Sequence, residues 1–116
     1  MMRKNPRSGP APGRAKTFAG KVALITGSAR GIGKTIAAAF GHSGAKVAIC
    51  DVNRAASMAT VREMRATGID AYFFSVDLSR RGGPQRMVAA VAKKLGGIDV
   101  LVNNARAGKR LGCAVD

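Results

Sequence analysis

Tryptophan is absent from the 116-residue sequence, tyrosine occurs once, and only six residues are acidic. Two cysteines and one histidine are too few for a disulfide framework or a His/Cys metal cluster, and they fit a reducing compartment. No apolar run approaches the ~20 residues that a membrane-spanning helix requires. The sequence therefore predicts a cytoplasmic protein with neither a disulfide scaffold, nor a metal site, nor a membrane span.

The shortage of acidic residues leaves a formal net charge of +14. A charge of this size favours binding to nucleic acid or to an anionic membrane. However, the basic residues are dispersed along the chain, few aromatic residues accompany them, and no nucleic-acid-binding motif occurs. A basic nucleic-acid-binding protein therefore remains an alternative, less favoured than a solvated basic surface.

The chain divides into three parts. Residues 1–16 hold five basic residues and no acidic ones, are rich in Gly and Pro, and are expected to form a disordered basic extension. Residues 17–105 carry the periodic apolar pattern of one folded domain. Residues 106–116 show no clear period and are expected to be a loop or tail.

Apolar patterning in residues 17–105 predicts four strands and three helices in strict alternation. The strands are expected at residues 22–26, 46–51, 71–76 and 98–103, and the helices at about 31–43, 54–67 and 84–95, with Asn53 as the N-cap of the second helix. Because the connections are short, this β-α-β-α-β-α-β order predicts an α/β fold with a doubly wound parallel sheet.

Several side chains are expected in the core. The first helix shows an apolar stripe at Ile32, Ile36 and Phe40. The second and third helices are expected to bury Met58, Val61, Met64, Met87, Val88, Val91 and Leu95, and Tyr72 is expected to be a residue of the third strand.

The stretch KVALITGSARGIG, Lys21–Gly33, joins the first strand to the first helix through a glycine turn. Free N–H groups and the helix dipole at such a junction hold a pyrophosphate. Gly27 allows the sharp turn, Gly31 has no side chain to block the phosphates, and Gly33 lets the helix approach the sheet. Ser28 offers a hydroxyl donor and Arg30 a positive charge.

The glycine spacing is G-x-x-x-G-x-G, which is neither the general G-x-G-x-x-G fingerprint nor a Walker motif. Lys34 and Thr35 resemble the end of a Walker motif, but the first glycine is misplaced for it. A nucleotide triphosphatase is therefore not favoured, and a dinucleotide is.

Asp51 ends the second strand, eighteen residues beyond Gly33. A carboxylate at this place accepts hydrogen bonds from a ribose diol and repels a 2′-phosphate, so it favours NAD over NADP. Two observations keep alternatives open. Arg30 and Arg54 could instead hold the phosphate of NADP, and Asp51 could simply be an acid at a helix start.

Several motifs together resemble those of the short-chain dehydrogenase/reductase family. They are GKVALIT at Gly20–Thr26, TGSARGIG at Thr26–Gly33, Asp77-Leu78 after the third strand, and Asn103-Asn104-Ala105 after the fourth. The resemblance implies a Rossmann-type NAD(P)-binding fold and hydride transfer between nicotinamide and a small alcohol or carbonyl substrate.

The resemblance also assigns cofactor-binding residues by position. The glycine turn would surround the pyrophosphate and adjoining ribose, Asp51 would bind the adenosine ribose, Asp77 and Leu78 would flank adenine, and Asn104 would steady the fourth strand. The full set is Gly27, Ser28, Ala29, Arg30, Gly31, Ile32, Gly33, Asp51, Asp77, Leu78 and Asn104.

Two departures from the family pattern limit the expected activity. Arg106 stands where the family has the glycine of Asn-Asn-Ala-Gly. The family's catalytic Tyr-x-x-x-Lys pair has no counterpart, because Val76 lies four residues beyond Tyr72. We therefore expect an inactive N-terminal cofactor-binding half that self-associates through an exposed fourth strand, whereas the full-length parent would be a homo-oligomeric enzyme. A stand-alone dinucleotide-binding or sensing module is the alternative.

Overall fold

The computed structural model describes residues 17–104. The elements follow the predicted order: β1 (Val22–Thr26), α2 (Gly31–His42), β2 (Lys46–Cys50), α3 (Arg54–Ala66), β3 (Ala71–Phe74), α4 (Gly83–Leu95) and β4 (Val100–Val102). The expected basic extension at 1–16 and tail at 106–116, including Arg106, lie outside the described residues, as does Ala105.

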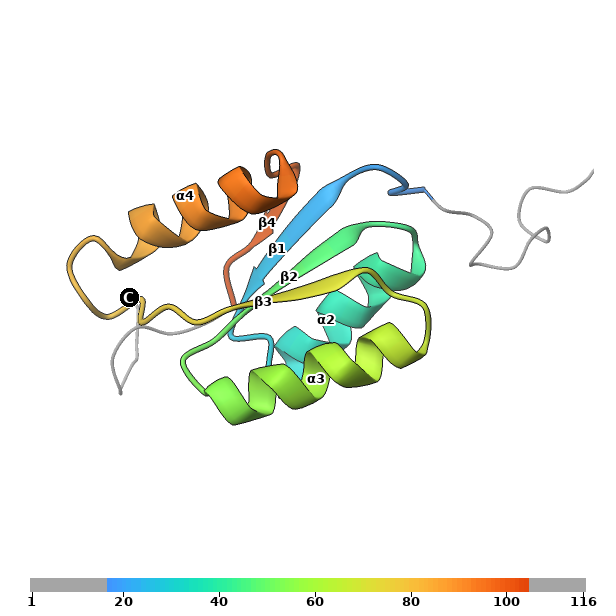
Figure 1. Cartoon of the computed structure of the whole chain (residues 1–116), viewed down its shortest axis with the longest axis horizontal. Coiled ribbons are helices and arrows are strands. Elements are labelled where there is room, and N and C mark those ends of the chain that lie inside the picture. Colours follow the sequence, from blue (N-terminus) through green and yellow to red (C-terminus); the bar gives the residue numbers. More distant parts are fainter. Residues whose placement is uncertain (1–16, 105–116) are drawn as a thin grey trace, which may run out of the picture.

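The four strands form one parallel sheet in the order β3-β2-β1-β4. Helices α2 and α3 cover one face of the sheet and α4 covers the other (Figure 1). The predicted doubly wound parallel sheet is confirmed. Strand β2 ends one residue earlier than predicted, and β3 and β4, each paired with one neighbour in the described residues, are also shorter than predicted.

The two faces of the sheet explain why the central strands are apolar at every position. Ala23 and Ile25 of β1 face α2 and α3, whereas Val22 and Leu24 face α4. Successive strand residues point to opposite faces, and here each face is covered by helices. All five residues of β1 are buried as a result.

Three predicted core residues are exposed. Ile32 is 73% exposed, Met58 44% and Val88 41%, so these assignments were wrong. The buried residues of helix α2 are the small ones, Gly33, Ala37 and Gly41, while Ile36 and Phe40 are partly buried. Small residues let the helix lie close to the sheet, and the bulky apolar stripe is therefore displaced to the side.

Two local predictions are confirmed in detail. The side chain of Asn53 accepts a hydrogen bond from the amide of Ala56 at 2.9 Å and caps α3. Strand β4 pairs with β1 alone in the described residues, and its Leu101 is 53% exposed. An apolar side chain on an open strand edge favours pairing with another chain.

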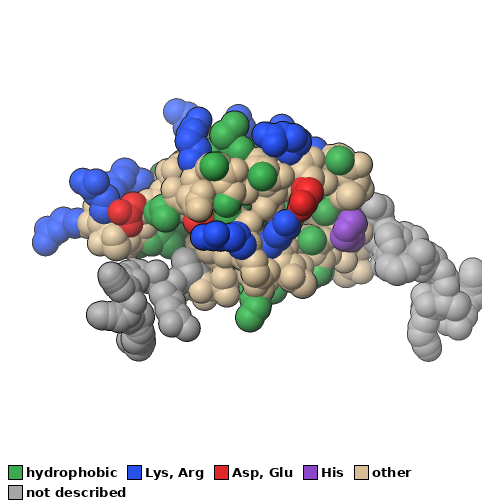
Figure 2. Space-filling view, turned by 90° about the horizontal axis from the view of Figure 1, so that it is seen from below, with side chains coloured by type: hydrophobic (Ala, Val, Ile, Leu, Met, Phe, Trp, Pro, Cys, Tyr) green, Lys and Arg blue, Asp and Glu red, His purple; other side chains and the backbone are tan. Residues whose placement is uncertain are grey.

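Basic side chains are spread over the face shown in Figure 2, and they do not gather into one stripe. This distribution fits a solvated basic surface better than a nucleic-acid groove. None of the helices in residues 17–104 is long and apolar enough to cross a membrane.

Candidate functional site

The predicted site residues meet at the edge of the sheet that is formed by the carboxyl ends of its strands. Gly27 follows β1, Asp51 follows β2, and Asn104 lies two residues beyond the end of β4. Because the strands are parallel, their carboxyl ends share that edge. The strand order reverses at β1, because β2 lies on one side of β1 and β4 lies on the other. Such a switch point is where open α/β sheets form a ligand-binding crevice.

The glycine turn depends on three glycines with different roles. Gly27 and Gly31 both have a φ of +63°, a left-handed conformation that favours glycine. A Cβ on Gly33 would overlap the carbonyl oxygen of Gly27 and lie 2.7 Å from Nδ2 of Asn104. A Cβ on Gly31 would meet nothing within 4 Å. Gly33 therefore allows close packing, whereas Gly31 faces open space.

Within residues 17–104, no side chain caps the N-terminus of α2. Its N-cap residue, Arg30, makes no side-chain capping hydrogen bond, and the first turn contains no acidic residue. The first N–H groups of a helix have no intrahelical partner, and the dipole places partial positive charge on them. The open space at Gly31 and this uncapped helix end fit a pyrophosphate.

Ser28 and Ala29 are buried beneath the turn. The Ser28 hydroxyl donates to the carbonyl oxygen of Ile25 at 2.6 Å and accepts from the amide of Cys50 at 3.1 Å. The Ala29 amide donates to Asp51, and its carbonyl oxygen accepts from the hydroxyl of Thr60 at 2.6 Å. These groups are engaged within the protein, so they shape the turn. The exposed residues at the helix start are Arg30, Gly31 and Ile32.

Asp51 lies between the end of β2 and the start of α3, where backbone amides fix its carboxylate. Its Oδ2 accepts from the amide of Ala29 at 3.2 Å, and its Oδ1 accepts from the amide of Asn53 at 3.0 Å. An ionised carboxylate has about four acceptor positions. The two hydrogen bonds from backbone amides fix the orientation of the Asp51 side chain, and the carboxylate keeps acceptor capacity for a ribose diol.

Asp77 is an exposed acceptor three residues beyond β3. Its Oδ1 accepts from the hydroxyl of Ser79 at 2.5 Å and from the Ser79 amide at 2.9 Å. These two bonds, hydroxyl first, lower the pKa of the Asp77 carboxyl below its ordinary value, and Arg80 adds to the shift. Leu78 packs, partly buried, against the core on the α4 side.

Asn104 ties the end of β4 to the glycine turn. Its Nδ2 donates to the carbonyl oxygen of Gly27 at 3.1 Å, and its amide donates to Oγ1 of Thr26 at 2.8 Å. Thr26 was not among the predicted site residues, and neither was Thr60. Thr26 carries a visible signal, a hydroxyl at the end of an apolar strand, whereas the contact of Thr60 with Ala29 has no local signature.

Other chemistries find little support in residues 17–104. Lys34 forms an ion pair with Glu63 at 2.6 Å, and the Thr35 hydroxyl donates to the carbonyl oxygen of Gly31 at 3.3 Å, so neither is arranged as in a Walker motif. Burial, and secondarily Asp51, raises the pKa of the Cys50 thiol to about 12, which leaves it a poor nucleophile. No group of three or more metal-ligating side chains occurs in this part of the chain.

Comparison with known proteins identifies the same architecture. The family model described as "short chain dehydrogenase" matches residues 21–112. A sorbitol dehydrogenase from Cereibacter sphaeroides is 46% identical over 86 residues, which are 74% of this chain and 32% of that protein.

Two crystal structures share the fold and more than a third of the matched sequence. A hydroxysteroid dehydrogenase from Escherichia coli has a TM-score of 0.74 and 36% identity over 78% of this chain and 38% of its own. A metagenomic short-chain oxidoreductase in complex with NADP has a TM-score of 0.72 and 38% identity over 78% of this chain and 41% of its own. The chain thus spans about a third of the length of the curated relative and about two fifths of each structure.

Proposed function

The chain belongs to the short-chain dehydrogenase family, and we propose that it supplies the NAD(P)-binding half of an oxidoreductase acting on a small alcohol or carbonyl compound. The observation that carries the proposal is the uncapped N-terminus of α2 behind the turn from Gly27 to Gly31. An anion placed there gains backbone N–H donors and the helix dipole without displacing any protein group.

Each part of the turn has a role toward the dinucleotide. The N–H groups at the start of α2 bind the pyrophosphate, and Gly31 leaves room for it. Asp51 accepts from the adenosine ribose, while Asp77 and Leu78 flank the adenine. Asn104 keeps β4 in register with the turn through its contact with Gly27. When bound, the nicotinamide gives or takes a hydride.

We propose that NAD is preferred over NADP. The Asp51 carboxylate is held in place by two amides and would repel a 2′-phosphate at the ribose. Of the two cations that argue for NADP, Arg54 lies 5.5 Å from the ring centroid of Phe73 and is engaged there. Arg30 is exposed at the helix start and remains the candidate for binding a phosphate.

The 116 residues are proposed to bind the cofactor without catalysing transfer. An alcohol or carbonyl substrate needs a proton donor or acceptor, and Tyr72 lacks the lysine partner that its family relatives place four residues on. Tyr72 also lies in β3, and a hydrogen bond with Asp70 is the main cause that raises the pKa of its phenol. For the intact enzyme we propose a cytoplasmic homo-oligomer.

The test is a titration of the purified chain with NADH and NADPH, followed by incubation with NAD(H) and a panel of alcohols and ketones. Saturable NADH binding without turnover is expected. Absence of binding to a folded chain would overturn the cofactor assignment. Turnover well above a blank would overturn the proposal that these 116 residues do not catalyse hydride transfer.

A stand-alone dinucleotide-binding module is the second candidate, since the described residues complete the glycine turn without a catalytic pair. The two proposals differ in the behaviour of β4. A half-domain leaves Leu101 exposed and self-associates, whereas an independent module is a stable monomer. Sedimentation of the chain with and without NADH separates them.

A further inference from the structure

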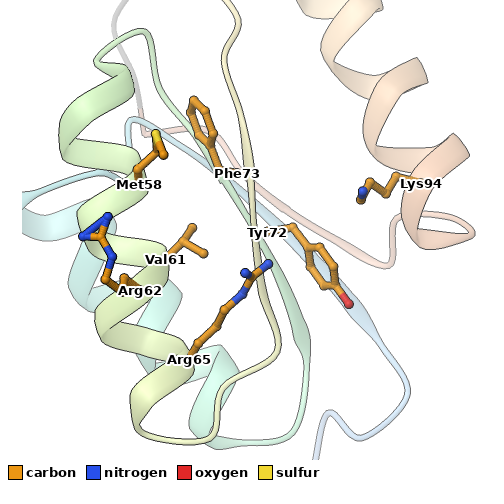
Figure 3. Close-up of a pocket in the computed structure, with 7 residues that line it drawn as sticks. All are labelled: Met58, Val61, Arg62, Arg65, Tyr72, Phe73 and Lys94. Carbon is orange, nitrogen blue, oxygen red and sulfur yellow. The ribbon is translucent and has the colours of Figure 1, made fainter.

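A cavity of about 440 Å³ lies along the outer edge of β3, in a region that none of the cofactor assignments uses. In the described residues β3 pairs with β2 alone, so its other side is open. Figure 3 shows Arg65 reaching toward this edge from α3 and Lys94 reaching toward it from α4, and Arg62 on α3 also lines the cavity. Phe73 and Tyr72 project to opposite sides of the strand between them.

The backbone of β3 presents hydrogen-bonding groups to this cavity. The carbonyl oxygens of Asp70 and Phe74 accept from the amides of Val47 and Asp51, so the even-numbered positions face β2. Because the backbone N–H and C=O groups of successive strand residues point to opposite edges, those of Ala71 and Phe73 point away from β2. The carbonyl oxygen of Ala71 accepts from Nε of Arg65 at 2.9 Å. The amide and carbonyl of Phe73 remain directed at the open edge.

The walls of the cavity are positively charged. Within residues 17–104 the recorded ion pair is Lys34–Glu63, so Arg62, Arg65 and Lys94 have no ion-pair partner in this part of the chain, and the nearby Asp70 carboxylate is hydrogen-bonded with the Tyr72 phenol. Arg65 lies 5.6 Å and Lys94 6.0 Å from the ring centroid of Tyr72. Contacts of cations with an aromatic face restrict their positions. The edge therefore offers positive charge from α3 and from α4, with Arg65 and Lys94 both held beside Tyr72.

Like charge argues against a second copy of this chain as the occupant. Pairing two β3 edges would bring Arg62, Arg65 and Lys94 of each copy together, and like charges across an interface are unfavourable. An acidic occupant gains attraction from the same residues. An extended peptide satisfies both the outward amide and the outward carbonyl oxygen of Phe73, whereas a small anion accepts from the amide alone.

We propose that this edge binds an extended, acidic peptide segment of a partner protein, which adds to the sheet as a strand beside β3. Main-chain hydrogen bonds to Phe73 supply part of the affinity. Because side chains alternate along a strand, neighbouring acidic residues of the peptide reach Arg62 on one face and Lys94 on the other. The proposal does not depend on the cofactor assignment.

The probe is a fluorescein-labelled octapeptide, Val-Glu-Glu-Val-Val-Glu-Glu-Val, titrated with the full chain at low salt and followed by fluorescence anisotropy. The double variant Arg62→Glu/Lys94→Glu is expected to weaken binding about tenfold or more. The matched control, Lys46→Glu/Lys93→Glu, changes the net charge equally at exposed positions outside the cavity, and it should stay within about twofold.

Hydrogen exchange then distinguishes strand addition from diffuse attraction. The peptide should protect the amide of Phe73, and a version with proline in place of the central valines should neither protect it nor bind comparably. Equal binding of the proline peptide, equal weakening by the control variant, or equal competition by a single-stranded oligonucleotide or inorganic phosphate would each overturn the proposal. Retained protection of the Ile25 and Ile49 amides shows that each variant is folded. If the glutamate double variant does not fold, Arg62→Gln/Lys94→Gln is used in its place.

Discussion

The carboxylate of Asp51 accepts a hydrogen bond from the amide of Ala29 at 3.2 Å, so the end of β2 is joined to the glycine turn that follows β1. The same two segments meet again where the Ser28 hydroxyl bonds to the amide of Cys50. On the other side, Asn104 joins the turn to the end of β4. The turn is therefore held from both neighbouring strands, which fixes the N-terminus of α2 before any ligand binds.

Replacement of Asp51 tests both of its roles. Asp51→Ala should weaken NADH binding about 10- to 100-fold, because charged hydrogen bonds contribute roughly 1.5–3 kcal/mol. NADPH binding should fall less, since the same change removes a repulsive charge. Isothermal titration of both cofactors measures the ratio. Asp70→Asn, which removes an acidic charge at an exposed position before β3, at the opposite end of the sheet from the turn, is the control and should leave the ratio unchanged. An unaltered NADH affinity in Asp51→Ala would contradict the ribose assignment.

Gly33→Ala should damage the turn itself. The new Cβ would overlap the carbonyl oxygen of Gly27, and backbone cannot move aside as easily as a flexible side chain. Overpacking of this kind costs about 1–3 kcal/mol in the free energy of unfolding. Urea denaturation and NADH titration should both show a loss. Thr35→Ala, an exposed change on the same helix, serves as the control, and equal behaviour of the two variants would show that the turn relaxes.

The order and pairing of the elements followed from local patterns. Glycines and a capping Asn53 mark where helices begin or end, and apolar runs such as Val22–Thr26 mark strands that are covered on both faces. Those signals lie within a few residues of the features they predict. The alternation of strands and helices then restricts the topology, because parallel crossovers are almost always right-handed.

Contacts between distant segments could not be predicted in the same way. Ser28 and Cys50 are 22 residues apart, and Ala29 and Thr60 are 31 apart. The exposure of Ile32 has a related cause. Periodicity identifies an apolar stripe, but it does not show that α2 would instead use small residues to approach the sheet.

Cys50 should resist thiol reagents in the folded protein. Its pKa of about 12 keeps the thiol neutral at pH 8, and its side chain is buried. In a Cys113→Ser background, a disulfide reagent should react with Cys50 at the rate of unfolding and at full speed in denaturant. Since the folded pKa is raised, the contribution of the thiol to stability is complete below its ordinary pKa of 9.0 and is lost as the pH rises toward about 12. Rapid labelling under native conditions would show that the strand end opens locally.

Ser79→Ala should raise the pKa of Asp77. The Ser79 hydroxyl is the largest cause of the lowered pKa, and its removal should return the carboxyl toward its ordinary pKa of 3.8. A lowered folded pKa stabilises the protein above the unfolded pKa, and the effect disappears as the pH falls through the folded pKa. The variant should therefore reduce the loss of stability in acid. NMR titration of the Asp77 carboxyl, with Ser75→Ala as the control, measures the shift.

Leu101→Lys should reduce self-association of the 116-residue chain. Leu101 is 53% exposed on β4, and an apolar residue on an open strand edge pairs readily with another chain. A lysine there is a common protection of such edges, so the concentration at which oligomers appear by light scattering should rise severalfold. Val88→Lys introduces the same charge at an exposed apolar position on helix α4 and should have little effect. If Val88→Lys were the stronger of the two, the contact would lie on the outer face of α4 and not on the sheet edge.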